Sequence, residues 1–431
     1  MKLTRNLICT LALLTAFGGV AQADGEDVNG VMLQAWYWDS PPGEQWWNKL
    51  SALMPQFREW GITALWVPPP CKGAGGGYSS GYDLYDYYDL GSKDQRGTIP
   101  TKWGTKEELL KMVGMAHANG MDVYADVIVN HRAGGDDNGY SYQNLVGSEA
   151  TGRFTMAPWD FHHGGQGDWD MDVAGQRDIA QGVPYVRDNL FQWIRWFDKQ
   201  TDVDGYRLDA TKHMPPDFVE GLLYQVQEGM NQKSFAVGEY FDGNPNTLEW
   251  WVNAVRRRSS TFDFTLHFNL HDMAHGNGYY DMRSLRRKFY DTEKSVTFVN
   301  NHDTFRRGNG MHIFIRTHLA YAFILAAEGY PSIYWLDLFD DNGTPRDWMV
   351  NLIWIHHMMA RGQQIERWAD SDLYVLEREG NLLAGFNDNT VSWRTEWVKT
   401  AFGPNVRLHD YASGVGDVWT NQDGYARISV C

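Results

Sequence analysis

The feature that most constrains the fold of this chain is a regular alternation of short apolar runs with longer amphipathic stretches. The runs have the length of strands, and the stretches have the apolar spacing of helices. The expected strands are Val31–Trp38, Ile62–Pro68, Met121–Asn130, Val203–Ala210, Ser234–Tyr240, Thr261–His267, Ser295–Asn301 and Pro331–Asp337. Eight such units predict a parallel (β/α)8 TIM barrel. A doubly wound open sheet has the same alternation, so alternation alone does not choose between the two.

Helix signals lie between these strands. Thr105 to Glu108 reads as a capping box ahead of a helical apolar pattern. Phe191, Ile194 and Phe197 form a helical stripe, and Asn351–Met359 follows the last expected strand. These signals predict helices in the connections that a barrel requires.

Two regions interrupt the alternation. Residues 132–176 are irregular and rich in Gly, Asp and His, which predicts an inserted domain after the third strand. From residue 362 the chain changes to short alternating runs with turn residues between them, which predicts an antiparallel β domain over 362–431. The barrel would then comprise residues 24–131 and 177–361, and any active site would lie in it.

The N-terminus has the pattern of a secretory signal peptide over residues 1–23. Lys2 and Arg5 precede the apolar stretch Leu7–Phe17, and Ala21 and Ala23 give the small-x-small cleavage pattern. A membrane anchor would need a longer apolar run. We therefore expect a mature chain from Asp24, secreted to the medium or the periplasm.

Composition excludes several partners. The chain has 38 Lys and Arg against 54 Asp and Glu, a formal net charge of −16. Binding to nucleic-acid phosphates or to an anionic bilayer needs a basic face, so we expect neither partner. Cys9 leaves with the signal peptide, and the remaining Cys71 and Cys431 do not make a disulfide framework. Sequence leaves open whether those two pair, and we expect separate thiols.

Acidic residues follow several of the expected strands. Asp209, Glu239 and Asp303 each come after an apolar run. Because the chemistry of a β/α barrel lies at the carboxyl ends of its strands, these side chains would converge at one mouth. Two converging carboxylates are the usual equipment for cleaving a glycosidic bond. Arg207 would face the same way as Asp209 and keep it ionised, whereas Glu239 would need crowding acids or an apolar wall to hold a proton.

Four segments resemble the signature regions of the α-amylase family, glycoside hydrolase family 13. They are Asp126–His131, Gly205–His213, Val237–Glu239 and Phe298–Asp303, in the order and spacing of the family. The resemblance runs from Gly30 through the C-terminal strands and looks closest to the secreted α-amylases of archaea and plants. It implies that Asp209 is the nucleophile, Glu239 the general acid/base and Asp303 the transition-state stabiliser. The sugar-binding residues that it implies are Tyr82, His131, Arg207, Lys212, His213 and His302.

The resemblance also implies a structural calcium ion between the barrel and the inserted domain. Asn130 matches the family's ligand position, His213 would contribute its main-chain carbonyl, and Asp168 looks like the principal carboxylate of the inserted domain. The loop before Asp168, residues 162–167, is shorter than in relatives. The remaining ligands therefore stay open, and the candidates are Asp160, Asp170 and Asp172.

Three further motifs suggest other chemistry. Residues 77–81 match the Gly-x-Ser-x-Gly elbow but lack a preceding strand and a following helix. His271 and His275 have the spacing of a zinc peptidase without its Glu, and the glycines of residues 73–77 lack the spacing of a dinucleotide loop. We expect none of the three activities.

The expected function is endo-hydrolysis of α-1,4-glucosidic bonds in starch, glycogen and related glucans, with retention of anomeric configuration. A maltooligosaccharide-forming exo-amylase or a transglycosylase would keep the same three carboxylates. A non-catalytic glucan-binding protein on the same fold would ordinarily have lost one of them. The expected partner is an α-glucan, and the expected state is a monomer.

Overall fold

The computed structural model describes most of the chain. It covers residues 30–43, 45–135, 151–162, 176–230, 234–289, 291–306, 308–412 and 416–430, together with one strand at 11–16. The chain forms two compact units. The first is Met32–Phe262 with Lys294–Val296, and the second is Asp263–Glu293 and Thr297–Cys431 with Met1–Val31.

Eight strands close into a barrel in the order β10-β11-β12-β13-β2-β3-β6-β9. They are β2 (Met32–Gln34), β3 (Ala64–Val67), β6 (Asp122–Val127), β9 (Gly205–Leu208), β10 (Phe235–Gly238), β11 (Ser260–Phe262), β12 (Ser295–Phe298) and β13 (Tyr330–Tyr334). Each coincides with or overlaps a run predicted from the sequence. The barrel prediction is confirmed, and the open sheet is excluded.

All eight predicted strands extend past the carboxyl ends of the observed strands, and two of them run into helices. The expected strand Thr261–His267 ends as β11 at Phe262, and helix α7 (Phe264–His275) begins immediately. Asp263 causes this change, because its Oδ1 accepts the Leu266 amide at 2.8 Å and caps the helix. Likewise, β13 gives way to the short helix α9 (Trp335–Leu338).

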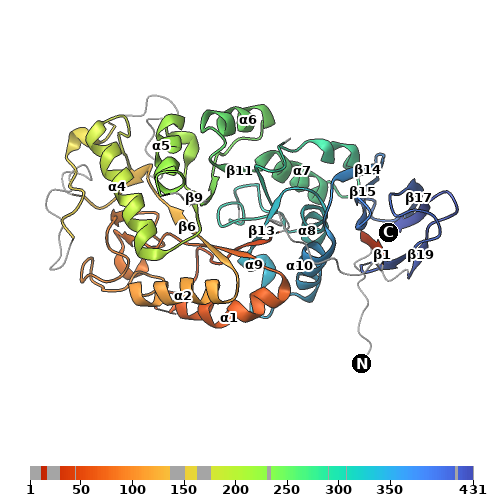
Figure 1. The fold of residues 1–431 in the computed structure, drawn as a ribbon, viewed down its shortest axis with the longest axis horizontal. Coiled ribbons are helices and arrows are strands. Elements are labelled where there is room, and N and C mark those ends of the chain that lie inside the picture. Colours follow the sequence, from red (N-terminus) through yellow and green to blue (C-terminus); the bar gives the residue numbers. More distant parts are fainter. Residues whose placement is uncertain are drawn as a thin grey trace. The chain divides into compact units, whose positions relative to one another are not determined.

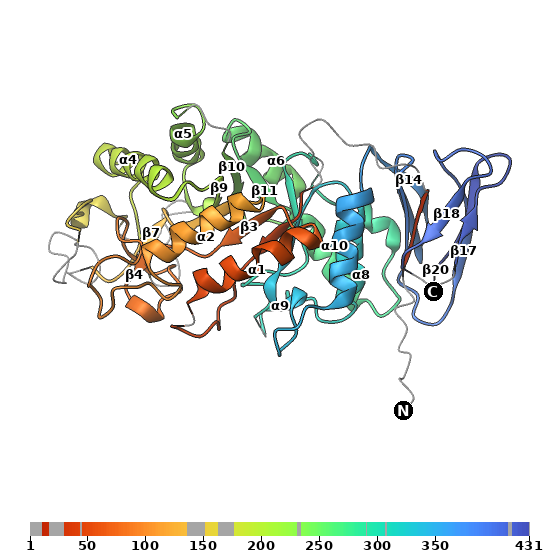
Figure 2. The ribbon, with the colours of Figure 1, turned by 60° about the horizontal axis from the view of Figure 1, so that its bottom comes forward.

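The helices of the first unit are labelled in Figure 1: α1 (Trp46–Trp60), α2 (Lys106–Ala118), α4 (Pro184–Thr201), α5 (Pro216–Val226) and α6 (Pro245–Ala254). Two of them carry signals that the sequence predicted, the start of α2 and the apolar stripe of α4. The predicted capping box is present at α2: Thr105 Oγ1 accepts the Glu108 amide at 3.2 Å, and Glu108 Oε2 accepts the Thr105 amide at 2.9 Å. Helices α1 and α2 pack side by side (Figure 2).

Short elements shape the loops of this unit. A β hairpin joins β4 (Lys72–Gly73) to β5 (Leu84–Asp86) and includes the 3-10 turn η1 (Gly76–Tyr78). Strand β7 (His131–Arg132) pairs with β8 (Arg177–Asp178) where the predicted inserted domain leaves and rejoins the barrel. Within that domain lies η2 (Pro158–Asp160), and η3 (Thr211–His213) follows β9.

The second unit contains the C-terminal β domain. Its helices α8 (Thr317–Ala326) and α10 (Asp347–Met359) pack together, and the turn η4 (Met282–Arg286) follows α7. Its strands are β14 (Gln364–Ala369), β15 (Leu373–Arg378), β16 (Leu382–Asn387), β17 (Arg394–Lys399), β18 (Arg407–Asp410), β19 (Val418–Trp419) and β20 (Tyr425–Val430). They enclose an apolar core that includes Leu373, Leu383 and Ile428. The predicted antiparallel domain is confirmed; its exact boundaries stay predictions.

An additional strand lies in the predicted signal peptide. Strand β1 (Leu11–Ala16) pairs antiparallel with β16 and β18, and Figure 2 shows it in red among the blue C-terminal strands. The sequence predicts a signal peptide over this segment and no strand. Among the described residues, no helix is both long enough and apolar enough to cross a bilayer.

Candidate active site

The centre of the candidate site is Arg207, the third residue of β9. Its Nη1 lies 2.9 Å from Asp126 Oδ1 and 2.6 Å from Asp209 Oδ1, and its Nη2 lies 2.9 Å from Glu239 Oε2. Only 1 % of its side chain is exposed. One guanidinium therefore bridges three carboxylates in a buried setting.

Strand register produces this cluster. Parallel pairing of β6 with β9 sets Asp126 opposite Arg207, and pairing of β9 with β10 sets Arg207 opposite Val237. Asp209 and Glu239 each lie two residues beyond that rung, so they face the same side as the guanidinium. At the carboxyl end of these strands, the Asp209 amide donates to Val127 O and the Glu239 amide to Leu208 O.

The charges of the cluster stabilise one another. Burial opposes the Arg207 charge, but Asp126, Glu239 and Asp209 outweigh it and hold the pKa of Arg207 well above its ordinary value. Burial also raises the pKa of Asp126, although Arg207 opposes that shift. Arg207 is therefore charged at any working pH.

Glu239 shares the Arg207 guanidinium with two other acids, Asp126 and Asp209. Its Oε2 also accepts the Ala210 amide at 3.1 Å. Both contacts favour the carboxylate form. Ala210 donates from a left-handed conformation (φ 48°), which a non-glycine residue adopts only when its surroundings enforce it.

Tyr82 brings an aromatic face to the cluster. It lies in the β4–β5 hairpin, and its hydroxyl donates to Asp126 Oδ2 at 2.6 Å. Its ring lies 5.1 Å from that of Trp38 and 5.8 Å from that of Trp36. Burial first, and Asp126 second, raise the pKa of Tyr82, so the phenol stays neutral. A motif marks Tyr82 as a sugar-binding residue in the sequence, but no motif marks Trp36 or Trp38.

Three more of the predicted sugar-binding residues belong to this unit: His131, Lys212 and His213. His131 Nε2 donates to the main-chain oxygen of Tyr82 at 3.0 Å, and burial lowers the pKa of His131 to about 4. Lys212 lies in η3 after β9 and pairs with Asp242 at 3.4 Å. His213 ends the same turn.

Asp303 and His302 belong to the second unit, at the end of the segment that follows β12. His302 is buried, and its Nε2 lies 3.2 Å from Asp303 Oδ2. Asn301 Oδ1 accepts the amides of Asp303 and Thr304 at 2.9 and 2.8 Å. This Asx turn fixes the direction of the chain at Asp303, whose side chain is 40 % exposed.

The structure brings together two of the three predicted calcium ligands. The Asn130 side-chain amide faces two oxygens, His213 O and Asp178 Oδ1; with Nδ2 turned toward them, the distances would be 3.1 and 3.3 Å. With Oδ1 turned toward them, three oxygens would face one another, which is the donor set of a hard cation. These residues therefore fit calcium.

The carboxylate at this position is Asp178, which the sequence analysis missed. Asp178 lies in β8 opposite His131, after the irregular stretch, and no motif marks it. The predicted ligand Asp168, with Asp170 and Asp172, lies outside the described residues. Asp160 caps its own 3-10 turn by accepting the Ala157 amide at 2.8 Å. Among the described residues, no group of three His, Cys, Asp or Glu is arranged to hold a metal.

The motifs set aside have structural roles. Ser79, in the elbow-like sequence, hydrogen-bonds to Asp83 in the hairpin. His271 and His275 stack on one another along α7, with ring centroids 4.3 Å apart. Cys71 is a buried free thiol whose Sγ lies 3.4 Å from Tyr87 O, and Cys431 lies outside the described residues.

Comparison with known proteins agrees with this geometry. The model of the family described as "Alpha amylase, catalytic domain" matches residues 50–344. The α-amylase of Bacillus licheniformis is 30% identical over 397 residues, covering 78% of this chain and 76% of that protein. The glucan 1,4-α-maltohexaosidase of Bacillus sp. (strain 707) is 29% identical, covering 95% and 92%.

A solved structure supports the fold. The crystal structure of the α-amylase from Geobacillus thermoleovorans, complexed with acarbose, has a TM-score of 0.72 at 20% identity and covers 94% of this chain and 96% of that one. The family model spans more than half of the chain, and the motifs occupy the carboxyl ends of its barrel strands. The chain therefore belongs to the α-amylase family, glycoside hydrolase family 13.

Proposed function

We propose that this chain is an endo-acting α-amylase that hydrolyses α-1,4-glucosidic bonds in starch, glycogen and related glucans with retention of configuration. The observation that carries the proposal is the contact of Asp209 and Glu239 with one guanidinium, at the ends of adjacent strands β9 and β10. A retaining glycosidase needs two carboxyl groups about 5–5.5 Å apart. Two carboxylates within hydrogen-bonding distance of a single Arg207 suit that requirement.

Asp209 is the proposed nucleophile. Its contact with Arg207 Nη1 keeps it ionised, so it can attack the anomeric carbon and displace the leaving sugar with one inversion. Glu239 then acts as a base and draws a proton from water, which attacks with a second inversion. The Ala210 amide and Arg207 suit Glu239 for this second step, because they stabilise its carboxylate form.

For the first step Glu239 must carry a proton. A bound sugar that replaces water around it would favour the neutral acid. Asp303 keeps the proposed role of transition-state stabiliser by its motif position after β12. Tyr82, His131, Arg207, Lys212, His213 and His302 are the proposed sugar-binding residues.

Stereochemistry tests this mechanism more directly than loss of activity does. An NMR time course on maltooligosaccharide should show the α-anomer first, before mutarotation. Appearance of the β-anomer first would overturn the assignment of Asp209 as nucleophile, even if every carboxylate variant were inactive.

A maltooligosaccharide-forming activity is the second candidate, and the maltohexaosidase relative that aligns with 95% of the chain favours it. The same carboxylates would serve both activities. A product time course on soluble starch separates them. An endo-enzyme lowers viscosity before small products accumulate, whereas an exo-enzyme releases one short product from the start.

A calcium ion is the proposed cofactor, and Asn130, Asp178 and the His213 carbonyl are the residues that would hold it, with Asp168 as the predicted further ligand. Calcium would supply structural support between the barrel and the inserted segment. We also propose secretion as a monomer after removal of residues 1–23. N-terminal sequencing of exported protein should begin at or near Asp24, and recovery of intact Met1 on membranes would contradict it.

A further inference from the structure

We infer that the Lys72 ammonium is a built-in cation that holds residues 93–104 against the β4–β5 hairpin and thereby positions Tyr82. Lys72 is thus a positioning residue for sugar binding. The inference rests on the proposed role of Tyr82, but the cage itself is described by contacts within the first unit.

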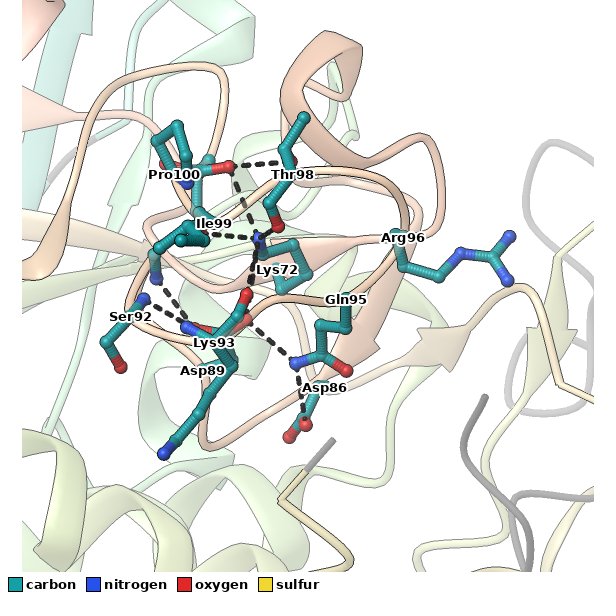
Figure 3. A network of polar contacts seen from close by, with 12 residues as sticks. Lys72, Asp86, Asp89, Ser92, Lys93, Gln95, Arg96, Thr98, Ile99 and Pro100 are labelled. Atoms are coloured by element: carbon teal, nitrogen blue, oxygen red, sulfur yellow. Dashed lines mark hydrogen bonds and ion pairs between the residues drawn. The ribbon is translucent and has the colours of Figure 1, made fainter. Parts of the chain in front are cut away.

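The ammonium group lies inside a ring of oxygen atoms (Figure 3). Lys72 Nζ donates to the main-chain oxygens of Ile99, Thr98 and Pro100 at 2.7, 2.8 and 3.2 Å. The Lys93 carbonyl lies at 3.5 Å, and so does Asp89 Oδ2. The side chains of Lys72 and Asp89 are both fully buried. Main-chain carbonyls with one carboxylate form the kind of oxygen shell that proteins otherwise offer to a bound cation.

The segment around the cage depends on that positive charge. Three consecutive carbonyls, residues 98–100, turn toward Lys72 Nζ. Thr98 O also accepts the Gln95 amide at 3.3 Å, and Pro100 O also accepts the Thr98 hydroxyl at 2.9 Å, so the loss of Lys72 would remove a charged donor from all three and would weaken Ile99 O most. Asp89 binds the chain on the other side of the cage. Its Oδ1 accepts the amides of Gly91 and Ser92 at 2.9 and 2.8 Å, while Oδ2 accepts Gln95 Nε2 at 2.8 Å.

The cage also reaches the inserted segment. Gln95 Nε2 donates to Asp86 Oδ2 at 3.0 Å as well as to Asp89 (Figure 3). Asp86 Oδ1 in turn accepts the Thr151 hydroxyl at 2.8 Å, and Asp86 Oδ2 accepts the Thr151 amide at 3.1 Å. One polar network therefore connects Lys72 with a residue far along the chain.

Residues 93–104 also contact the hairpin nearer to its tip. Arg96 Nε donates to Ala74 O at 2.8 Å, and Trp103 Nε1 donates to Ser80 O at 3.1 Å. At the tip, Gly76 (φ 60°) lies so close to Arg96 O that a Cβ atom there would collide with it. The segment that Lys72 holds in shape thus supports the hairpin on the approach to Tyr82.

The proposal predicts a coupled loss of function. Lys72→Met keeps the volume of the side chain and removes its charge. We expect the variant to lose about 10- to 100-fold in kcat/KM on maltooligosaccharide, because small displacements of substrate-positioning groups have effects of that size. Lys111→Met, at an exposed position of α2, is the matched control and should behave like wild type.

A double-mutant cycle separates positioning from general destabilisation. If Lys72 acts through Tyr82, Lys72→Met combined with Tyr82→Ala should lose no more activity than Tyr82→Ala alone. Additive losses would overturn the proposal. Hydrogen exchange gives a readout without substrate: amides of residues 74–83 and 93–100 should exchange faster in Lys72→Met, while those of α4 stay unchanged.

Chemical rescue tests the need for charge. Lys72→Ala removes three methylene groups and the ammonium, which n-propylammonium replaces. Propylammonium, added during refolding if necessary, should restore exchange protection and kcat/KM, whereas 1-propanol should not. Equal rescue by 1-propanol would mean that the side chain only fills space and would overturn the proposal, as would wild-type exchange and kinetics in Lys72→Met. Full activity of Tyr82→Ala would instead refute the proposed role of Tyr82. The exchange experiment would still show whether Lys72 orders the segments around it.

Discussion

Two of the buried cations in the first unit, Arg207 and Lys72, are surrounded in contrasting ways. Arg207 lies among carboxylates, with Asp126, Asp209 and Glu239 within 2.9 Å of its guanidinium nitrogens. Lys72 lies among neutral main-chain carbonyls, with Asp89 at 3.5 Å. The planar guanidinium distributes its donors over several acids, while the compact ammonium acts as a point charge. The first arrangement surrounds one charge with the proposed catalytic acids, and the second joins segments of the main chain.

The comparison also separates two ways of satisfying a buried charge. In the Arg207 cluster the acids outnumber the cation, so removal of any member changes the charge state of the others. In the Lys72 cage most partners are dipoles that cannot titrate. Substitution of Arg207 should therefore have the larger effect on turnover, and substitution of Lys72 should have the larger effect on the order of the chain around it.

The largest expected effect is on turnover at the acids around Arg207. Asp209→Asn and Glu239→Gln should each fold normally and lose about 10²–10⁴-fold or more in kcat. Because Glu239 is the proposed donor of the proton to the leaving group, Glu239→Gln should recover partly on a substrate with a very good leaving group, and Asp209→Asn should not. Steady-state kinetics on starch and on an activated glycoside check this. Near-wild-type turnover by either variant would remove that residue from the mechanism.

The second prediction concerns how much each cation contributes to the free energy of unfolding. Arg207→Met leaves buried carboxylates without their counter-charge and should lower the free energy of unfolding by about 3–5 kcal/mol. Lys72→Met loses hydrogen bonds from a charged donor and should cost about 1.5–3 kcal/mol. Denaturant unfolding of both variants measures the difference. A larger loss at Lys72 would reverse the comparison.

The third effect is acid sensitivity beside the Arg207 cluster. Burial lowers the folded-state pKa of His131 to about 4, although the hydrogen bond to the Tyr82 main-chain oxygen opposes this shift. Its unfolded value is about 6.5, so the unfolded chain binds more protons between these values. Stability should therefore fall as pH drops from about 6.5 to 4, by about 3 kcal/mol from this residue. His131→Gln should flatten that part of the profile, and an unchanged slope would contradict the assignment.

The smallest effect concerns metal removal. A ligand present at a hundredfold excess over its dissociation constant stabilises the folded state by about 2.7 kcal/mol. Chelator should lower the melting temperature, calcium should restore it, and Asp178→Asn should abolish the response. The Lys72 cage carries its cation covalently, so Lys72→Met should respond to chelator as wild type does. Identical melting curves with chelator and with calcium would remove the proposed site.

Much of the fold could be predicted because its signals are local. The barrel strands are continuous apolar runs, and the Thr105–Glu108 capping box lies within four residues. Strand ends were less predictable, since Asp263 and α7 override a run that reads as strand. Strand β17 offers little apolar pattern to detect, because only Val398 of its six residues is buried.

The sequence by itself determined the eight strand–helix units and the motif residues Asp209, Glu239 and Asp303, because each depends on neighbours along the chain. Tertiary structure alone decided which groups share Arg207, that Asp178 faces Asn130, and that Lys72 lies among the carbonyls of residues 98–100. Those contacts depend on strand register and loop closure between distant segments. A periodicity cannot encode them, because a side chain's charged or polar partner is selected by distance in space rather than by separation in sequence.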